Sequence, residues 1–391
     1  MRECPIMELN SKRLPLEGIK IVDLTRVLSG PFCTALLSDL GADIIKVEPP
    51  AGDEYRHVGP FKEGESALFT LMNRNKKGVV ADLKNSSHLA WVLELASDAD
   101  VFVENFKPGV AERLGVGYEA VKAVNPDIIY ASISGFGQSG EHSQLPAYDL
   151  VVQAMSGMMA ITGEKDGEPT KVGESIADLV AGLYASWAIL AALFDRQRSG
   201  EGVHLDIAML DCLFSLMPTP VAQWMFGGEA PGRVGNRHPL STPFGSFSAQ
   251  NGQVIIAVLN NRQFAALCGA MDQPAIAEDP RFSSDEERTR HEPELRDLIE
   301  TWLAGHSVES AIAALAGAGI PASPVLGMDE ALAHARDGER QLLPTQHHPR
   351  LGDIPMMAQP VRASSWKTSV PKTAPTLGEH NGELFDQVPK P

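Results

Sequence analysis

Residues 18–50 read GIKIVDLTRVLSGPFCTALLSDLGADIIKVEPP, and this stretch decides the fold class. Its first apolar run, Gly18–Thr25, and its last, Asp43–Pro50, each have the length and composition of a buried strand. Between them a helical pattern follows Gly30 and ends at Gly41, a residue type favoured directly after a helix. The stretch therefore predicts a strand–helix–strand unit.

The same alternation continues along the first third of the chain. Helical patterns cover His88–Ala99 and Pro108–Leu114, and strand-like runs cover Asp100–Phe106 and Asp127–Gly137. Strands that alternate with helices form a parallel sheet with helices on both faces. We therefore predict an α/β fold.

The middle of the chain is predicted to be mainly helical. Residues Tyr148–Gly163 have the pattern of one amphipathic helix, and a second helix follows and ends near Gly200. Within it, the apolar run Leu179–Phe194 is too short to span a membrane, and its many small residues suit a buried core helix. Residues Val203–Leu210 are predicted to form a further strand.

A second domain is indicated by a change of composition near residues 227–235, which are rich in Gly, Pro and polar residues. A strand at Gly252–Leu259 and a return strand within Ala318–Gly327 follow. We predict a Rossmann-like large domain whose first part is 1–224, a small α/β domain at 225–325, and a segment at 326–391 that returns to the large domain.

The net charge and the cysteine pattern of the chain limit its expected binding partners and its expected location in the cell. The 33 Lys and Arg residues against 50 Asp and Glu residues give a net charge of −17, which disfavours nucleic acid and anionic membranes as partners. The cysteines Cys4, Cys33, Cys212 and Cys268 are scattered and form no metal-binding pattern. No apolar leader precedes Gly18, so we expect a reducing, cytoplasmic location and no metal.

Asp178 is the most informative single residue in the chain. It stands in GESIADLVAG, residues 173–182, where it opens an apolar helix rich in small residues. It could simply cap that helix by accepting backbone N–H bonds. It could instead be a nucleophile, because a carboxylate can attack an activated acyl carbon and form a mixed anhydride. The residues alone leave both interpretations open.

A series of motifs in a fixed order resembles the class III CoA-transferase family, also called the formyl-CoA transferase or CaiB–BaiF family. The resemblance covers nearly the whole chain. The matching segments are Asp23–Asp53, Asn73–Lys84, Val101–Gly115, Ser132–Gly140, Tyr148–Gly157, the segment around Asp178, Arg196–Asp211, Gly319–Val325 and Leu377–Leu384.

This resemblance implies reversible transfer of CoA from an acyl-CoA to a free carboxylic acid, with a dicarboxylate such as succinate as the expected acid. Asp178 matches the family's nucleophile, which would pass through aspartyl anhydrides and an aspartyl-CoA thioester. Acyl-CoA is then a substrate, and no tightly bound cofactor is expected. The resemblance also implies a homodimer of two interlocked chains, with each active site between the large domain of one and the small domain of the other.

The resemblance further implies a set of CoA contacts. Cations would bind the phosphates, an apolar wall would face the adenine, and amides would hold the pantetheine chain. Each of these residues also has a simpler interpretation as a core residue, a turn residue or a solvated charge. The residues are Arg26, Leu28, Ser29, Leu83, Lys84, Asn105, Phe106 and Arg113.

On the acyl side, Leu28 stands where oxalate-using members carry a glutamine, so the resemblance favours other acyl groups. Tyr148 replaces the catalytic histidine of the family's racemase branch, and a phenol with an ordinary pKa near 10 is a poor base. Asp149 matches an acidic position of the transferases, although it could be a helix cap. Arg237 and His238 could bind a second substrate carboxylate, or form a polar interdomain loop.

Two alternatives to CoA transfer follow from the same residues. One is an acyl-CoA racemase or epimerase acting on 2-methylacyl-CoA, which would exchange the hydrogen at C2 without exchanging CoA. The other is a non-catalytic CoA-binding protein, in which Asp178 would have only a structural role. Transfer is the function that we expect.

Overall fold

The structure, a computed structural model, describes residues 13–368 and 371–385, and these pack into two compact units. The large unit takes its described residues from Met1–Met158, Val172–Ala222 and Ala335–Pro391, and the small unit consists of Met159–Lys171 and Gln223–His334. Cys4 lies outside the described residues. Whether 1–224, 225–325 and 326–391 act as separate domain segments stays a prediction.

A six-stranded sheet forms the centre of the large unit, and all its neighbouring strands pair in parallel, as predicted. Ile21 lies between Ile44 on one side and Val101 on the other, which fixes the register of the three central strands. From edge to edge the order is β5 (Lys77–Val80), β2 (Asp43–Glu48), β1 (Lys20–Asp23), β6 (Val101–Glu104), β7 (Ile129–Ser134) and β8 (Val203–Ala208).

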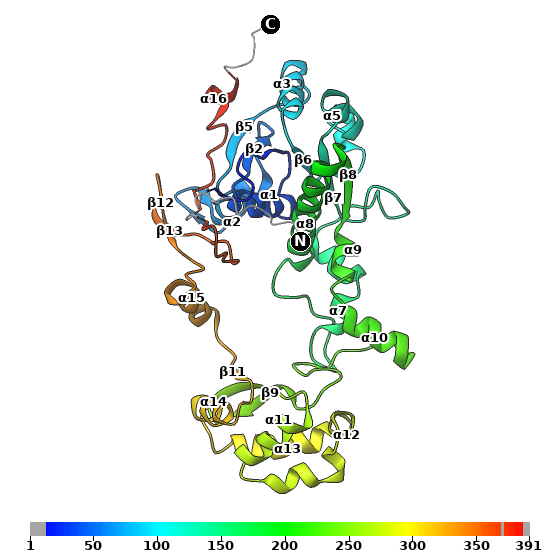
Figure 1. Ribbon diagram of the computed structural model, residues 1–391, viewed down its shortest axis with the longest axis vertical. Coiled ribbons are helices and arrows are strands. Elements are labelled where there is room, and N and C mark those ends of the chain that lie inside the picture. The colour runs from blue at the N-terminus through cyan, green and yellow to red at the C-terminus, as the bar shows by residue number, and fades with distance from the viewer. Residues whose placement is uncertain (1–12, 369–370, 386–391) are drawn as a thin grey trace, which may run out of the picture. The chain divides into compact units, whose positions relative to one another are not determined.

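Helices cover both faces of this sheet, and alternate strand residues enter two separate cores (Figure 1). Ile21 and Ile129 face the core that contains α1 (Ser29–Asp39) and α8 (Ile176–Ser199), whereas Val22 and Tyr130 face the core that contains α3 (Ser86–Ser97) and α5 (Tyr118–Val124). Apolar residues on both faces of a strand are the signature of a buried parallel sheet.

Shorter elements complete the large unit. They are η1 (Glu54–His57), β3 (Phe61–Lys62), β4 (Glu65–Ser66), α2 (Ala67–Met72), α4 (Val110–Arg113), α6 (Asp149–Met155), α9 (Met209–Phe214), β12 (Thr345–His348), β13 (Gly352–Pro355) and α16 (Asn381–Phe385). The chain passes from one unit to the other four times: within α7 (Met158–Ile161), between Lys171 and Val172, within α10 (Pro218–Gly227) and within α15 (Met328–Asp337).

The edge of the sheet at β5 is covered by the last part of the chain. The Nδ1 atom of His380 accepts the Gly78 N–H, and the side-chain oxygen of Asn381 accepts the Val80 N–H. These bonds satisfy backbone groups that an open sheet edge would leave exposed. The described residues after His334 therefore belong to the large unit, although they are distant in sequence from its strands.

The small unit has its own core around an antiparallel sheet in the order β11 (Ala322–Pro324), β10 (Gly252–Ala257) and β9 (Phe244–Ala249). Val254 and Ile256 of the central strand point into this core. The helical elements of the unit are α11 (Asn261–Ala270), η2 (Pro274–Glu278), η3 (Pro280–Phe282), α12 (Asp285–Arg290), α13 (Glu292–Leu303) and α14 (Val308–Gly317).

The predicted single helix over Tyr148–Gly163 is wrong. The structure divides it into α6 and α7, because Gly157 has a φ of 88°, a left-handed conformation that ends a helix. The amphipathic pattern continues across this break, since both short helices place apolar residues toward the same core.

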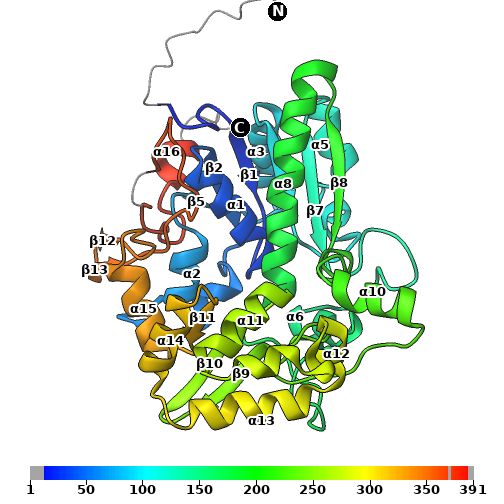
Figure 2. The same cartoon turned by 60° about the horizontal axis from the view of Figure 1, so that its bottom comes forward.

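Helix α8 is longer than its apolar run and has 24 residues. By length and composition it could cross a membrane, but half of its most apolar window is buried inside the protein. It lies against α1 and the sheet, as Figure 2 shows, and Ala177, Ala181, Ala185 and Ile189 are fully buried there. This is the packing of a core helix.

A glycine on α8 allows the closest approach between the two helices. A Cβ atom placed on Gly182 would lie 2.4 Å from the carbonyl oxygen of Ser29. Real Cβ atoms do not approach a backbone oxygen so closely, so only glycine fits here. The contact fixes the start of α1 against the first turns of α8.

We expect Gly182→Ala to destabilise the large unit by about 1–3 kcal/mol, because the new methyl group must push α1 and α8 apart. The measurement is the midpoint of urea unfolding. Gly269→Ala on α11 is the matched control: this glycine has nothing within 4 Å of an added Cβ, so the change should be neutral or stabilising. Equal losses in both variants would contradict this account.

Candidate active site

The loops that follow β1 and β6 diverge at the middle of the sheet. The connection from β1 leads through α1 to β2 on one side, whereas β6 leads to β7 on the other. In open parallel sheets such a reversal of strand order leaves a crevice at the carboxyl ends of the strands, where ligands bind. The predicted CoA contacts Arg26, Ser29, Asn105 and Phe106 all lie on these two loops or directly after them.

Asp178 lies in the first turn of α8, on the end of the helix that faces the loop after β1. The hydroxyl and the backbone N–H of Ser29 lie near its carboxyl group and lower the pKa of Asp178. Asp178 is the third residue of α8 and not its N-cap, which is Ser175, and the Ala177 N–H is bonded over 2.8 Å to the Asp149 carboxylate. The purely structural interpretation of Asp178 as a cap is therefore wrong.

Opposing effects set the charge of Asp178. Burial raises its pKa, and the negative charge of Asp149 raises it further, whereas the two Ser29 donors lower it; the result is a pKa of about 7. Asp149 is itself fixed, since its second oxygen accepts a bond of 2.7 Å from Gln153. The carboxyl of Asp178 is thus poorly solvated and near its titration midpoint at neutral pH, as suits a reactive group.

A cavity of about 280 Å³ opens beside Asp178. It brings together six residues that the sequence analysis singled out, from four different segments of the large unit. They are Arg26, Ser29, Asn105, Phe106, Tyr148 and Asp178. Tyr148 is 71% exposed, so its phenol stands at the surface of this cavity and not in its interior.

A second, smaller cavity of about 150 Å³ shares Arg26 and Phe106 with the first. It is lined in addition by Leu83 and Lys84, two further predicted CoA contacts. The Arg26 guanidinium lies over the Phe106 ring, 4.9 Å from its centre. The cation and the ring together form the wall that the two cavities have in common.

The turn after β6 is held by two polar side chains, the half-buried Asn105 and the buried Glu104. Asn105 accepts the Arg26 N–H and donates to the Arg26 carbonyl, each over 2.8 Å. Glu104, only 3% exposed, accepts the Phe106 N–H over 2.7 Å. Burial raises the pKa of Glu104 to about 7 although this bond and the Ser132 hydroxyl lower it. Asn105 therefore ties the two loops together.

Comparison with known proteins shows the family to which the chain belongs. Residues 16–381 match the sequence model of CoA-transferase family III. The chain belongs to this family. Among relatives of known activity, the transferase is 39% identical to an acetyl-CoA:oxalate CoA-transferase of Acetobacter aceti over 96% of both chains. It is 37% identical to a succinyl-CoA:glutarate CoA-transferase of Mus musculus over 96% of this chain and 86% of the mouse protein.

Solved structures agree with the assignment. A CaiB/BaiF family protein from Brucella suis is 35% identical and superimposes with a TM-score of 0.84, covering 96% of the transferase and all of that chain. A protein from Mycobacterium tuberculosis is 30% identical with a TM-score of 0.84, covering 95% and 99% of the two chains. The transferase therefore has the mixed α/β fold with a parallel central sheet that this family shares.

Several predicted residues lie outside the walls of the two cavities. Leu28 is only 6% exposed, and Arg113 is exposed on α4. Asp149 accepts the N–H of Ala177, the residue before Asp178. None of these three is among the described residues that line either cavity. Their roles toward CoA or acyl groups stay predictions.

Arg237 and His238 belong to the small unit. The Arg237 guanidinium pairs with Glu292 and also donates to the Val234 carbonyl over 3.1 Å. The His238 ring is stacked on Phe244, with 5.0 Å between the ring centres. Their proposed contact with a substrate carboxylate also stays a prediction.

The structure reveals polar groups that the sequence analysis missed. Ser134 lines the larger cavity, and its buried hydroxyl has no hydrogen-bond partner within the described part of the chain. Lys46 and Asp53 form a buried ion pair behind the loop after β1. A signal for this pair was present, because Lys46 interrupts an apolar strand and a buried charge requires a partner.

We expect kcat/KM for CoA exchange to fall about tenfold per unit as the pH is lowered below about 7, because a protonated Asp178 cannot attack. Asp149→Asn removes a neighbouring negative charge and still offers an oxygen to the Ala177 N–H, so the acid limb should move to lower pH. Initial rates across the neutral range measure this. Glu104→Gln is the control and should not move the acid side of the pH profile of kcat/KM. A shift in this variant would show that Glu104, and not Asp178, is the group that titrates.

Proposed function

We propose that the transferase moves CoA reversibly from an acyl-CoA thioester to a dicarboxylic acid, with Asp178 as the covalent nucleophile. The observation that carries this proposal is that Asp178 lines a cavity together with Ser29, whose hydroxyl and N–H lower the pKa of the Asp178 carboxyl. Family membership supplies the reaction class, and the geometry supplies a residue suited to perform it.

In the first half-reaction, an ionised Asp178 oxygen attacks the thioester carbonyl carbon. The carbon–sulfur bond breaks, CoA thiolate leaves with the electron pair, and an acyl–aspartyl anhydride remains. The thiolate then attacks the aspartyl carbonyl of this anhydride. The donor acid departs as its carboxylate, and Asp178 carries CoA as a thioester.

In the second half-reaction, a carboxylate oxygen of the acceptor attacks the aspartyl thioester and releases thiolate again. The thiolate attacks the acceptor carbonyl of the new anhydride, which forms the product acyl-CoA and frees the Asp178 carboxylate. Every tetrahedral intermediate carries an oxyanion, which N–H and O–H donors stabilise. We propose the Ser29 hydroxyl and N–H as such donors, because both lower the pKa of the Asp178 carboxyl.

We propose that CoA lies along the wall formed by Arg26 and Phe106. The guanidinium suits a phosphate, and the ring and Leu83 offer apolar surface to the adenine. Lys84 at the smaller cavity adds a second cation. Asn105 supports the same wall from behind through its bonds to Arg26. CoA enters this scheme as a substrate and not as a resident cofactor.

The acceptor class is suggested by the relatives. Their names include oxalate, glutarate and mesaconate as acids, which are all dicarboxylic, and succinyl-CoA as a donor. The second carboxylate of such a substrate needs a cationic side chain as its partner. Because the chain as a whole has a net charge of −17, this partner must be an individual basic residue at the site. We propose Arg237, with His238 beside it, for this role.

We further infer a Rossmann-like large domain, an inserted small domain and an interlocked homodimer. The strand order with its reversal between β1 and β6 supports the first inference. Leu183, Trp187 and Phe194 form an exposed apolar stripe on α8, and this supports the homodimer because a second chain could cover them. A cytoplasmic location is also proposed, since Cys33, Cys212 and Cys268 are free thiols.

We expect Asp178→Asn to lower CoA exchange by at least about 1,000-fold, because the amide cannot form the anhydride. Hydroxylamine added during turnover should convert the aspartyl thioester of the unsubstituted enzyme to a hydroxamate, which peptide mass spectrometry locates. Modification of a different carboxylate, or an unaffected exchange rate in Asp178→Asn, would remove Asp178 from the mechanism.

With succinyl-CoA as the donor, we expect dicarboxylic acceptors to give at least about tenfold higher kcat/KM than monocarboxylic acids of equal length. A panel including glutarate, mesaconate and matched monocarboxylates, read by mass spectrometry of the CoA products, measures this. Arg237→Gln should reduce the preference while leaving monocarboxylates unaffected. Deuterium uptake at C2 of a 2-methylacyl-CoA without CoA exchange would instead indicate a racemase.

A further inference from the structure

The loop that carries Ser29 has an unusual backbone. Val27 has a φ of 66°, in the left-handed region that β-branched residues strongly disfavour. Such a conformation persists only where surrounding contacts determine it, and it is found most often at functional sites. Val27 lines the same cavity as Asp178 and stands two residues before Ser29.

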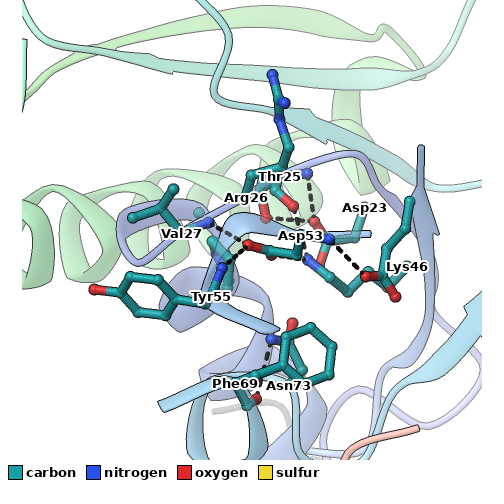
Figure 3. A network of polar contacts seen from close by, with 12 residues as sticks. Asp23, Thr25, Arg26, Val27, Lys46, Asp53, Tyr55, Phe69 and Asn73 are labelled. Carbon is teal, nitrogen blue, oxygen red and sulfur yellow. Dashed lines mark hydrogen bonds and ion pairs between the residues drawn. The ribbon is translucent and has the colours of Figure 1, made fainter. Parts of the chain in front are cut away.

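The contact that holds Val27 is a buried carboxylate. Asp53 is fully buried, and its Oδ1 atom accepts the Val27 N–H over 3.0 Å and the Tyr55 N–H over 2.9 Å. Its other oxygen, Oδ2, accepts from the Lys46 ammonium over 2.8 Å. Figure 3 shows Asp53 between these three groups.

Lys46 extends the same support to the start of the loop. It is fully buried and donates to the Thr25 carbonyl over 2.8 Å as well as to Asp53. Asp23 holds the other side of Thr25, accepting its N–H over 2.8 Å, and also pairs with Lys76 over 3.0 Å. The first residue of the loop, Thr25, and its middle residue, Val27, are therefore both bound to buried charges.

These charges remain ionised although they are buried. Burial alone would raise the pKa of Asp53, but the Lys46 charge and the N–H donors of Tyr55 and Val27 hold it below its usual value. Burial would likewise lower the pKa of Lys46, yet Asp53, Asp23 and Glu48 raise it. The Lys46–Asp53 ion pair therefore holds the Thr25–Ser29 loop through bonds that are buried away from water.

We propose that Asp53, held by Lys46, is a positioning residue that keeps Val27 left-handed so that the Ser29 hydroxyl and N–H face the Asp178 carboxyl. This role rests on the proposed function of Asp178 as nucleophile. Asp53 does not touch the reacting atoms itself. It acts through the Thr25–Ser29 loop, and the same oxygen fixes the start of η1 at Tyr55.

The test compares Asp53→Asn with a control ion pair. Asp39 is also buried and pairs with Arg74 over 2.6 Å, but it bonds Asn75 and no residue of the Thr25–Ser29 loop. Oδ1 of Asp53 accepts from Val27 and Tyr55 whereas Oδ2 accepts from Lys46, and an amide has only one oxygen to serve both sides. We therefore expect Asp53→Asn to release the loop, to lower kcat about 10–100-fold and to move the acid limb of kcat/KM to higher pH, because Asp178 loses donors that favour its charged form. Asp39→Asn should leave the limb unmoved.

Two further variants keep the test decisive. Asp53→Glu retains the charge for Lys46 but displaces the acceptor from the Val27 N–H, so it should show the same shift if Asp53→Asn does not fold. Val27→Gly adopts the left-handed conformation without strain, so combined with either Asp53 variant it should restore part of kcat and return the limb toward its original pH.

The outcomes separate this inference from the proposed function. If Asp178→Asn is inactive while every folded Asp53 variant keeps the original kcat and acid limb, the positioning role is wrong and the nucleophile stands. A loss of kcat with an unmoved limb, or no recovery with Val27→Gly, also overturns the positioning role. If Asp178→Asn remains active, the nucleophile assignment fails whatever Asp53 does.

Discussion

The contact between Gly182 of α8 and the Ser29 carbonyl is the constraint on which the site depends. Because no side chain separates the two backbones, the first turn of α8 lies directly against the loop after β1. That approach brings Asp178, one helical turn before Gly182, within reach of the Ser29 donors. Asp178, the proposed nucleophile, is thereby placed at the crevice between the loops that follow β1 and β6.

The site also depends on a fixed conformation of the Thr25–Ser29 loop. Burying Lys46, Asp53 and Asp23 is costly, and such charges are tolerated only when each finds partners. Here their partners include backbone groups of the Thr25–Ser29 loop, so their desolvation is coupled to one loop conformation. Burial raises the pKa of Asp178 to about 7, whereas the fixed hydroxyl and N–H of Ser29 favour its charged form.

Much of the fold was predictable because parallel strands and their helices leave local patterns. The runs around Ile21, Ile44 and Ile129 are apolar on both faces, and glycines such as Gly41 mark helix ends. The break at Gly157 was missed, because the apolar pattern continues through it and only the backbone conformation ends the helix. A charge inside a strand, as at Lys46, was visible but gave no indication of its partner.

The sequence by itself determined the α/β class, the family, and the candidates Asp178, Arg26 and Phe106, because motifs and periodicity are local properties of the chain. Only the tertiary structure decided which of these candidates share a cavity, and that Asp149 caps the helix that carries Asp178. It alone joined Asp53 to Val27, since hydrogen bonds between loops depend on packing and not on distance along the sequence.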